Sequence, residues 1–302
     1  MTRKILVYQV DSFTKELFKG NPAGVVPYAD GLSEEQMQFI AREMNNSETS
    51  FLFSPDDNSC DGVIRYFTPG KEVPTCGHAT IAAMYAKAIE ENLNSAVYRY
   101  KTKVGVLPFE ILKTGNDYKI AMTQGKIEFE KPFNNGMKDR ITKALNLSKE
   151  DLDESCPVQI VSTGHSKVMI GIKSRSVLNG LNPNYFELAR ISKEINCNGF
   201  FVFTFDSDSP NILTHGRMFA PAISINEDPV TGNANGPLGA FIVKHRLAEI
   251  NGEEFSFTGR QGEAINRPGE VEVNVKIVNN EPVLVKISGN AIIVFKTEIE
   301  IR

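Results

Sequence analysis

The chain has 302 residues, of which 41% are apolar and 23% are charged, as is typical of a folded globular protein. The formal net charge is -4, and the 33 basic residues are scattered, so the sequence lacks the basic stripe that a nucleic-acid backbone requires. The apolar runs are shorter than the roughly 20 residues of a membrane span, and the N-terminal segment reaches polar residues before a signal-peptide core could form. We therefore expect a cytoplasmic protein of two domains, without nucleic-acid or membrane partners.

The four cysteines lie far apart in the sequence, with neither a C-x-x-C pair nor clustered histidines. This spacing indicates neither a zinc site nor a disulfide framework, and reduced thiols are the simplest interpretation. The cysteines are Cys60, Cys76, Cys156 and Cys197. Cys76, in a glycine-containing turn, is the one whose context suggests chemistry. We expect no metal site.

In chain order, a strand pattern at 5–10 is followed by Asn21-Pro22-Ala23-Gly24, a turn that feeds a second strand. A helix pattern begins near Leu32 and ends in a polar turn that carries Glu48, directly before the apolar strand 51–53. This position puts the Glu48 carboxylate at the edge of the core, where acid/base chemistry is feasible. A solvated or capping glutamate fits the same pattern, since most carboxylates lie on protein surfaces.

The motif Arg65-Tyr66-Phe67-Thr68-Pro69 precedes the turn Cys76-Gly77-His78, which opens an apolar helix pattern. A neutral imidazole at a helix N-terminus could donate to a substrate oxygen, and the helix dipole disfavours its cationic form. A buried structural histidine is equally compatible with this position. Other strand patterns lie at 63–67, 96–100, 105–111, 118–122, 158–162, 168–172, 270–278 and 283–287.

The second half repeats the order of the first. Arg217-Met218-Phe219-Ala220-Pro221 matches the motif at 65–69, and the turn Thr231-Gly232-Asn233 opens a second apolar helix. The repetition predicts an α+β fold of two similar domains, each a bent sheet wrapped around a central helix. We place the domains at 1–128 and 129–302, because glycine, proline and asparagine punctuate the chain near this junction. The sequence leaves open whether the final strands return to the first domain.

If the two turns face each other, two helix N-termini form a site for a carboxylate or an enolate oxygen. Asp228, just before the second turn, either caps that turn or, together with His78, holds the substrate opposite Glu48. Asn198 stands at about the place in the second half that Glu48 has in the first. The duplication therefore favours a site with one acid/base carboxylate.

Five motifs in this order resemble the PhzF-like isomerase family, which is related in fold to diaminopimelate epimerase. Each motif alone is unspecific, whereas five in the same order, spread over nearly the whole chain, are specific. The motifs are 10–13 with 20–24, 46–49, 65–69, Glu72 with 76–80, and 228–232.

The resemblance implies two similar domains with a cleft between them, no organic cofactor or metal, and in many members a homodimer. It implies that Glu48 takes a proton from one substrate carbon and returns it to another, while His78 and Asp228 orient the substrate. We expect further substrate contacts from Asn46, Cys76, Gly77, Gly232 and Asn233. The expected function is that of a cofactor-independent isomerase of a small carboxylated metabolite.

Two departures from the family refine this expectation. Asn233 follows Thr231-Gly232 where the phenazine enzyme has serine, which points to the branch of uncharacterised bacterial isomerase-like proteins rather than to phenazine chemistry. Cys76 has no second thiol near Thr231, so a two-thiol racemase is not expected. Two alternatives remain: a racemase or epimerase that uses Glu48 with Cys76 or His78, and a non-catalytic protein that binds a small ligand.

Overall fold

The computed structural model describes residues 2–301, which divide into two compact units. Unit 1 comprises Met1–Met122 and Ser288–Arg302, and unit 2 comprises Thr123–Ile287. The sequence-based division at 128/129 falls within strand β9 (Ile127–Phe129), which pairs with β10 (Gln159–Thr163) of unit 2. The last strand, β17 (Glu281–Ile301), begins in unit 2 and ends in unit 1.

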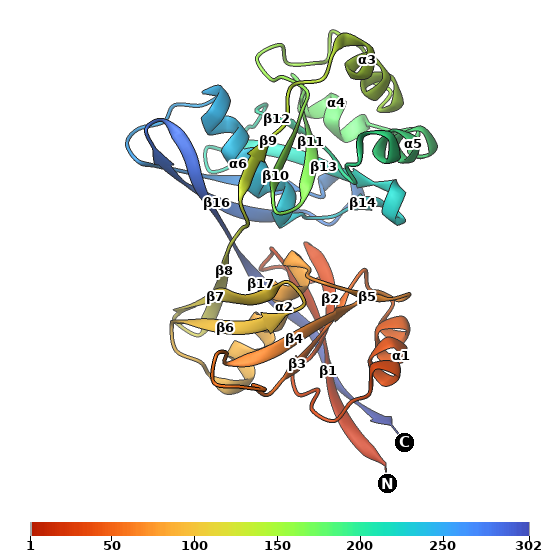
Figure 1. The fold of residues 1–302 in the computed structure, drawn as a ribbon, viewed down its shortest axis with the longest axis vertical. Helices are drawn as coiled ribbons and strands as arrows, with labels where there is room; N and C mark the ends of the chain where they lie inside the picture. The colour runs from red at the N-terminus through yellow and green to blue at the C-terminus, as the bar shows by residue number, and fades with distance from the viewer. Residues whose placement is uncertain (1, 302) are drawn as a thin grey trace. The chain divides into compact units, whose positions relative to one another are not determined.

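Unit 1 is a mixed sheet packed around helix α2 (Gly77–Glu91), as can be followed in Figure 1. Strand β1 pairs antiparallel with both β2 and β17, β2 runs parallel to β3, and β3 pairs antiparallel with β4. The other elements of this unit are α1 (Glu34–Met44), β1 (Arg3–Ser12), β2 (Asn21–Val26), β3 (Thr49–Phe53), β4 (Gly62–Phe67), β5 (Glu72–Val73), β6 (Ala96–Thr102), β7 (Gly105–Thr114) and β8 (Asp117–Thr123).

Helix α2 is the central helix that the sequence predicted for the first half. Residues 78–86 are all buried, and the helix packs against β1, β2, β3 and β7. A helix that is apolar on every side is stable only when its neighbours cover every face. The N-terminal turn of α2 therefore has a fixed place beside the ends of the strands that surround it.

Helix α1 sets the position of the turn that carries Glu48. Ser33 and Gln36 form a capping box at its start, and Asn45 ends it with a left-handed backbone at φ 51°. The chain then turns back into β3, which runs parallel to β2. Glu48 lies in this short connection, directly before β3.

Unit 2 has the same plan, with α6 (Gly232–His245) as its central helix, packed against β10, β11, β15 and β16. The other elements of this unit are α3 (Asn135–Ala144), α4 (Arg175–Gly180), α5 (Tyr185–Ile195), β11 (Ser166–Gly171), β12 (Phe200–Thr204), β13 (Thr214–Ala220), β14 (Ile225–Asp228), β15 (Glu254–Gln261), β16 (Gly269–Val278), and the 3-10 turns η1 (Pro221–Ile223) and η2 (Glu263–Ile265).

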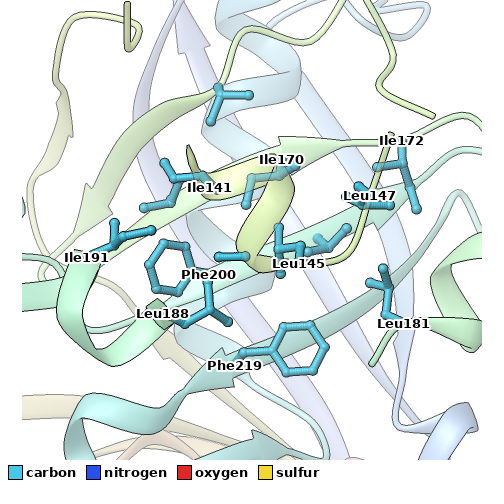
Figure 2. Close-up of a cluster of buried hydrophobic side chains, with 14 of the residues drawn as sticks. Ile141, Leu145, Leu147, Ile170, Ile172, Leu181, Leu188, Ile191, Phe200 and Phe219 are labelled. Carbon is cyan, nitrogen blue, oxygen red and sulfur yellow. The ribbon is translucent and has the colours of Figure 1, made fainter. Parts of the chain in front are cut away.

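A separate apolar cluster lies between α3, α5 and strands β11, β12 and β13 of unit 2 (Figure 2). Burying these side chains is the main favourable contribution to holding the helices on the sheet. The labelled members are Ile141, Leu145, Leu147, Ile170, Ile172, Leu181, Leu188, Ile191, Phe200 and Phe219. All belong to unit 2, so this cluster stabilises that unit on its own.

Strand registers relate the two halves residue by residue. Phe51 pairs with Arg65 in unit 1, and Val202 pairs with Arg217 in unit 2. Both arginines hold a glutamate on the next short strand: Arg65 binds Glu72, and Arg217 binds Glu227. The duplicated α+β architecture predicted from the sequence is confirmed.

Candidate active site

The candidate active site of unit 1 is built where the turn after α1 meets the start of α2. His78 Nε2 lies 3.5 Å from Glu48 Oε2 and 3.3 Å from Ser47 Oγ. The other ring nitrogen, Nδ1, lies 3.4 Å from Cys76 Sγ. The His78 and Glu48 side chains are 8% and 14% exposed. One imidazole thus stands between a thiol and a partly buried carboxylate.

Hydrogen bonds from β1 hold the two segments that carry this cluster. Ser12, at the end of β1, donates to the carbonyl oxygen of His78 at 2.8 Å. The amides of Asn46 and Gln9 exchange two hydrogen bonds, at 3.1 and 2.8 Å. The Asn46 side chain therefore ties the Glu48 turn to β1, and its expected substrate contact stays a prediction.

A second set of polar groups holds the first turn of α2 in place through hydrogen bonds. Thr80 Oγ1 donates to the carbonyl oxygen of Cys76 at 2.6 Å and lies 2.6 Å from the Tyr66 hydroxyl. Complete burial raises the pKa of Tyr66 well above its usual range, so this phenol stays neutral. Its role is to hold the helix start, because a neutral buried phenol cannot exchange protons with solvent near pH 7.

The corresponding turn of unit 2 carries Asp228. Its carboxylate accepts a hydrogen bond from the hydroxyl of Thr231, the N-cap residue of α6. The Gln261 amide donates to the carbonyl oxygen of Asp228 at 2.8 Å and accepts from the backbone N–H of Thr231 at 3.1 Å. Asp228 is thus joined to Thr231, the N-cap residue of α6, while its capping role and its contact with substrate both stay predictions.

Asn233 has a backbone conformation that the following sequence explains. Its φ and ψ, -80° and 17°, depart from helical values inside α6. Pro237 stands four residues later, and a proline ring collides with the carbonyl group of the residue four positions before it. The departure at Asn233 moves that carbonyl aside and gives the first turn of α6 a different shape from that of α2.

The registers also refine which residues correspond. The N–H of Gly24 donates to the carbonyl oxygen of Glu48, and the N–H of Val168 donates to that of Gly199. Gly199, rather than Asn198, therefore occupies the position of Glu48. Tyr66 pairs with Val73 and Met218 pairs with Asp228, so Asp228 corresponds to Val73, Thr231 to Cys76 and Asn233 to His78. Glu48 and Asp228 therefore do not correspond: Glu48 lies in the connection before β3, and Asp228 lies at the end of β14.

Lys167 on β11 fills the space that the missing carboxylate leaves. A Cβ atom on Gly199 would lie 2.4 Å from Lys167 Cδ, so the lysine stem occupies the region where a side chain at 199 would begin. Lys167 is 7% exposed, and its ammonium donates to the carbonyl oxygen of Ser166 at 3.1 Å. Burial lowers the pKa of Lys167, and the nearby charges of Cys197 and Asp228 counteract this effect. Sequence patterns did not single out this residue.

The structure brings the expected site residues together in two groups. Glu48, Cys76, Gly77 and His78 meet in unit 1, and Asp228, Gly232 and Asn233 meet in unit 2. The atoms of Glu48, Cys76 and His78 that could bind a metal all lie within 4.8 Å of one another. A second such group, on the exposed surface, consists of Asp56, Asp57 and Cys60. Among residues 2–301, every helix is too short or too polar to cross a membrane.

Known proteins resemble this chain over its whole length. The family model described as phenazine biosynthesis-like protein (PhzC-PhzF) matches residues 10–297. An uncharacterised isomerase of Clostridium acetobutylicum is 58% identical over 99% of both chains. The chain belongs to the PhzC-PhzF family. A trans-2,3-dihydro-3-hydroxyanthranilate isomerase of Pseudomonas chlororaphis is 31% identical over 94% of this chain and 95% of its own.

The PhzC-PhzF membership predicted from the motifs is confirmed, and the chain is an isomerase. A solved PhzF-family structure from Bacillus anthracis matches with a TM-score of 0.88 and 34% identity, covering 99% of this chain and 100% of that one. A probable proline racemase from Agrobacterium radiobacter matches with a TM-score of 0.64 and 10% identity, covering 98% and 92%. At that identity, the second likeness concerns the fold alone.

Proposed function

We propose that this PhzC-PhzF isomerase moves a proton within a small carboxylated metabolite, with Glu48 as its acid/base and without a cofactor. The observation that carries the proposal is the contact between the partly buried Glu48 carboxylate and the His78 imidazole at the start of the buried helix α2. A carboxylate at the edge of an apolar core, within reach of a helix N-terminus, is suited to proton transfer at carbon.

In this mechanism Glu48 removes a proton from a carbon next to a carboxyl or conjugated group. The negative charge then moves onto substrate oxygen, where the first N–H groups of α2 and the His78 ring stabilise it. Glu48, now protonated, returns the proton to a different carbon. Positioned acid/base transfer contributes roughly 10²- to 10⁴-fold to the rate, and positioning and electrostatics contribute the rest.

Asp228 and the first turn of α6 are proposed to orient the substrate, as the family resemblance implies. The hydrogen bonds from Thr231 and Gln261 hold Asp228 in place before the helix. Asn233, with its non-helical backbone, gives this turn a shape of its own and is proposed to contact the substrate with Gly232. The relative that is named for dihydrohydroxyanthranilate acts on a carboxylated ring, which agrees with the substrate class proposed here.

The test is carbon-bound proton exchange. The chain is incubated in D₂O with a panel of carboxylated cyclic and amino-acid-derived metabolites, and loss of C–H signals is followed by NMR. We expect exchange with one class of substrate and a decrease of roughly 10²-fold or more in Glu48→Gln. Exchange at an unchanged rate in this variant would exclude Glu48 as the acid/base.

A racemase that uses Cys76 as a second base is the competing enzymatic function. The 3.4 Å separation of Cys76 Sγ and His78 Nδ1 favours it, because an imidazole can take the thiol proton. Cys76→Ser should then abolish exchange at the substrate α-carbon. Under our proposal, Cys76→Ser retains turnover and Glu48→Gln loses it.

The remaining alternative is a non-catalytic binding protein. It requires tight binding of a metabolite without any C–H exchange, and the same affinity in Glu48→Gln. Isothermal titration with each metabolite that binds, next to the exchange measurement, separates the two functions.

We also propose that the enzyme acts as a homodimer in the cytoplasm, as the family resemblance implies. Sedimentation of the purified chain tests the dimer, and a single species at the monomer mass of 33.5 kDa would contradict it.

A further inference from the structure

We propose that Glu48, Cys76 and His78 capture a thiophilic divalent cation, Zn²⁺ above all, and that capture reversibly blocks the isomerase. These three side chains offer a carboxylate, a thiol and an imidazole, and their ligand atoms lie within 4.8 Å of one another. The metal site itself depends on unit 1 alone. Its inhibitory effect rests on the proposed function of Glu48.

The three ligand atoms, all within 4.8 Å of one another, need only a small contraction to reach the spacing of a tetrahedral zinc site. Zinc binds sulfur at about 2.3 Å and nitrogen or oxygen at about 2.0–2.2 Å, so neighbouring ligand atoms lie roughly 3.3–3.7 Å apart. The separation of Cys76 Sγ from His78 Nδ1 is 3.4 Å, and that of His78 Nε2 from Glu48 Oε2 is 3.5 Å. The two contacts use opposite ring nitrogens, so a rotation of the thiol or the carboxylate side chain must bring all three donors to one metal ion.

The donor set selects the metal. Thiolate and imidazole favour zinc and similar ions, whereas Mg²⁺ and Ca²⁺ require oxygen ligands. Three protein ligands leave a fourth position for water, as in zinc sites that are open to small molecules.

The cluster of Glu48, Cys76 and His78 is better suited to bind a metal ion than the exposed cluster of Asp56, Asp57 and Cys60. His78 is 8% exposed, and the bond from Ser12 to its carbonyl oxygen holds the helix start that carries both Cys76 and His78. The exposed cluster has no imidazole, and its Asp56 carboxylate is engaged by Lys101 at 2.8 Å. The same chain therefore contains a matched control site with one thiol.

Metal binding and proton transfer exclude each other at this site. A bound cation takes up the carboxylate lone pair with which Glu48 would remove a proton. It also occupies one nitrogen of His78. We therefore expect Zn²⁺ to stop proton exchange and a chelator to restore it fully.

The direct test uses Co²⁺, which reports its ligands in the absorption spectrum. The full chain, stripped of metal with a chelator, is titrated with Co²⁺ and then with Zn²⁺ as a competitor. We expect one Co²⁺ per chain, tetrahedral d–d bands and a thiolate charge-transfer band. Cys76→Ser should remove the charge-transfer band and weaken binding more than tenfold, since loss of outer partners alone costs roughly 10- to 100-fold. Cys60→Ser should change neither.

Several results would overturn the proposal. One is binding that Cys60→Ser abolishes and Cys76→Ser leaves intact; another is the absence of bound metal at equimolar Co²⁺ or Zn²⁺. Glu48→Gln serves as a second variant, with thermal unfolding as the check that each variant folds. A metal site without any proton exchange would support this inference while removing the proposed function, so the two fail separately.

Discussion

Lys167 is the residue whose setting departs most from ordinary expectation, because a lysine on a core strand is 7% exposed. The room for it comes from Gly199, directly before the neighbouring strand β12. In unit 1 the residue that corresponds to Gly199 is Glu48. At this corresponding position, one half therefore carries a carboxylate, and in the other half the side chain of Lys167 takes up the room.

The protonation of Lys167 predicts a pH-dependent stability. Burial lowers its pKa in the folded chain, so the unfolded chain binds more protons between that lowered value and the ordinary lysine range. The free energy of unfolding therefore rises with pH across this window, and the lysine costs stability below it. We expect Lys167→Met to raise the free energy of unfolding at pH 7 by about 1–4 kcal/mol. The gain should shrink as pH approaches the ordinary lysine value.

Urea unfolding of both chains at pH 7 and pH 10 measures this effect. Lys193→Met, an exposed substitution within α5, is the control and should stay within about 0.5 kcal/mol of the unmodified chain. Lower stability of Lys167→Met at both pH values would instead mean that attraction between the ammonium and Asp228 outweighs the cost of burial.

The sequence could predict where Glu48 and His78 lie, next to helix patterns, but not the burial of Lys167, and the reason is physical. Glu48 and His78 stand in turns next to helix patterns, and local sequence reveals such places. Lys167 is buried because a residue on another strand lacks a side chain, and no local pattern contains that fact. The correspondence of Glu48 with Gly199 likewise required strand register, since sequence alone placed it at Asn198.

At the scale of elements, the two arginine–glutamate pairs differ in how deeply the arginine is buried and in what else it binds. Arg217 and Glu227 are 6% and 8% exposed, and Arg217 also donates to the carbonyl oxygens of Leu178 and Leu181 at 3.0 and 2.9 Å. It thereby ties the end of α4 to β13 and β14. Arg65 is 25% exposed, and its partner Glu72 also binds Lys103.

This difference predicts unequal losses of stability. Arg217→Met leaves Glu227 buried without its ion-pair partner and should lower the free energy of unfolding by about 3–5 kcal/mol. Arg65→Met leaves Glu72 paired with Lys103 and should cost roughly 1 kcal/mol, as partly exposed pairs do. Thermal and urea unfolding of the two variants measure both values, and equal losses would show that burial of the pair is not the deciding factor.

Element prediction was most accurate for strands such as β4, β8 and β16, whose bounds were predicted to within one residue, and least accurate for β17. The pattern at 283–287 correctly identified a strand, but Ser288-Gly289-Asn290 resembles a turn, whereas the strand continues to Ile301. A Cβ atom on Gly289 would lie 2.4 Å from the Phe13 ring, so glycine is required there for close approach and not for a turn. Strands β13 and β14 escaped prediction because charged and small residues interrupt their apolar pattern, and β15 because only Phe255 and Phe257 mark its buried face.

At the scale of the whole molecule, β17 makes the first and last segments of the chain interdependent. Residues 291–301 pair antiparallel with β1, so that Arg3 stands opposite Ile301 and Ser12 opposite Ala291. β1 also pairs with β2, and both pack against α2. Unit 1 is therefore assembled from both ends of the sequence, whereas unit 2 is one continuous segment.

A chain that ends at residue 287 tests this dependence. We expect the backbone amides of β1 to lose protection from hydrogen exchange, because their partner strand is gone, while α6 and β12 keep theirs. Exchange followed by mass spectrometry resolves the segments, with the full chain as reference. Unchanged protection of β1 would show that its pairing with β2 suffices.

The shared strand also bears on the order in which the protein matures on the ribosome. Domains usually fold in the order of their synthesis, the N-terminal one first. Here the N-terminal sheet lacks its edge partner until the last residues have left the exit tunnel, while residues 123–287 can collapse earlier. During most of translation β1 is an open strand edge, a ready template for wrong pairing. The segment that later frames Glu48 is therefore exposed to wrong pairing until β17 has paired with it.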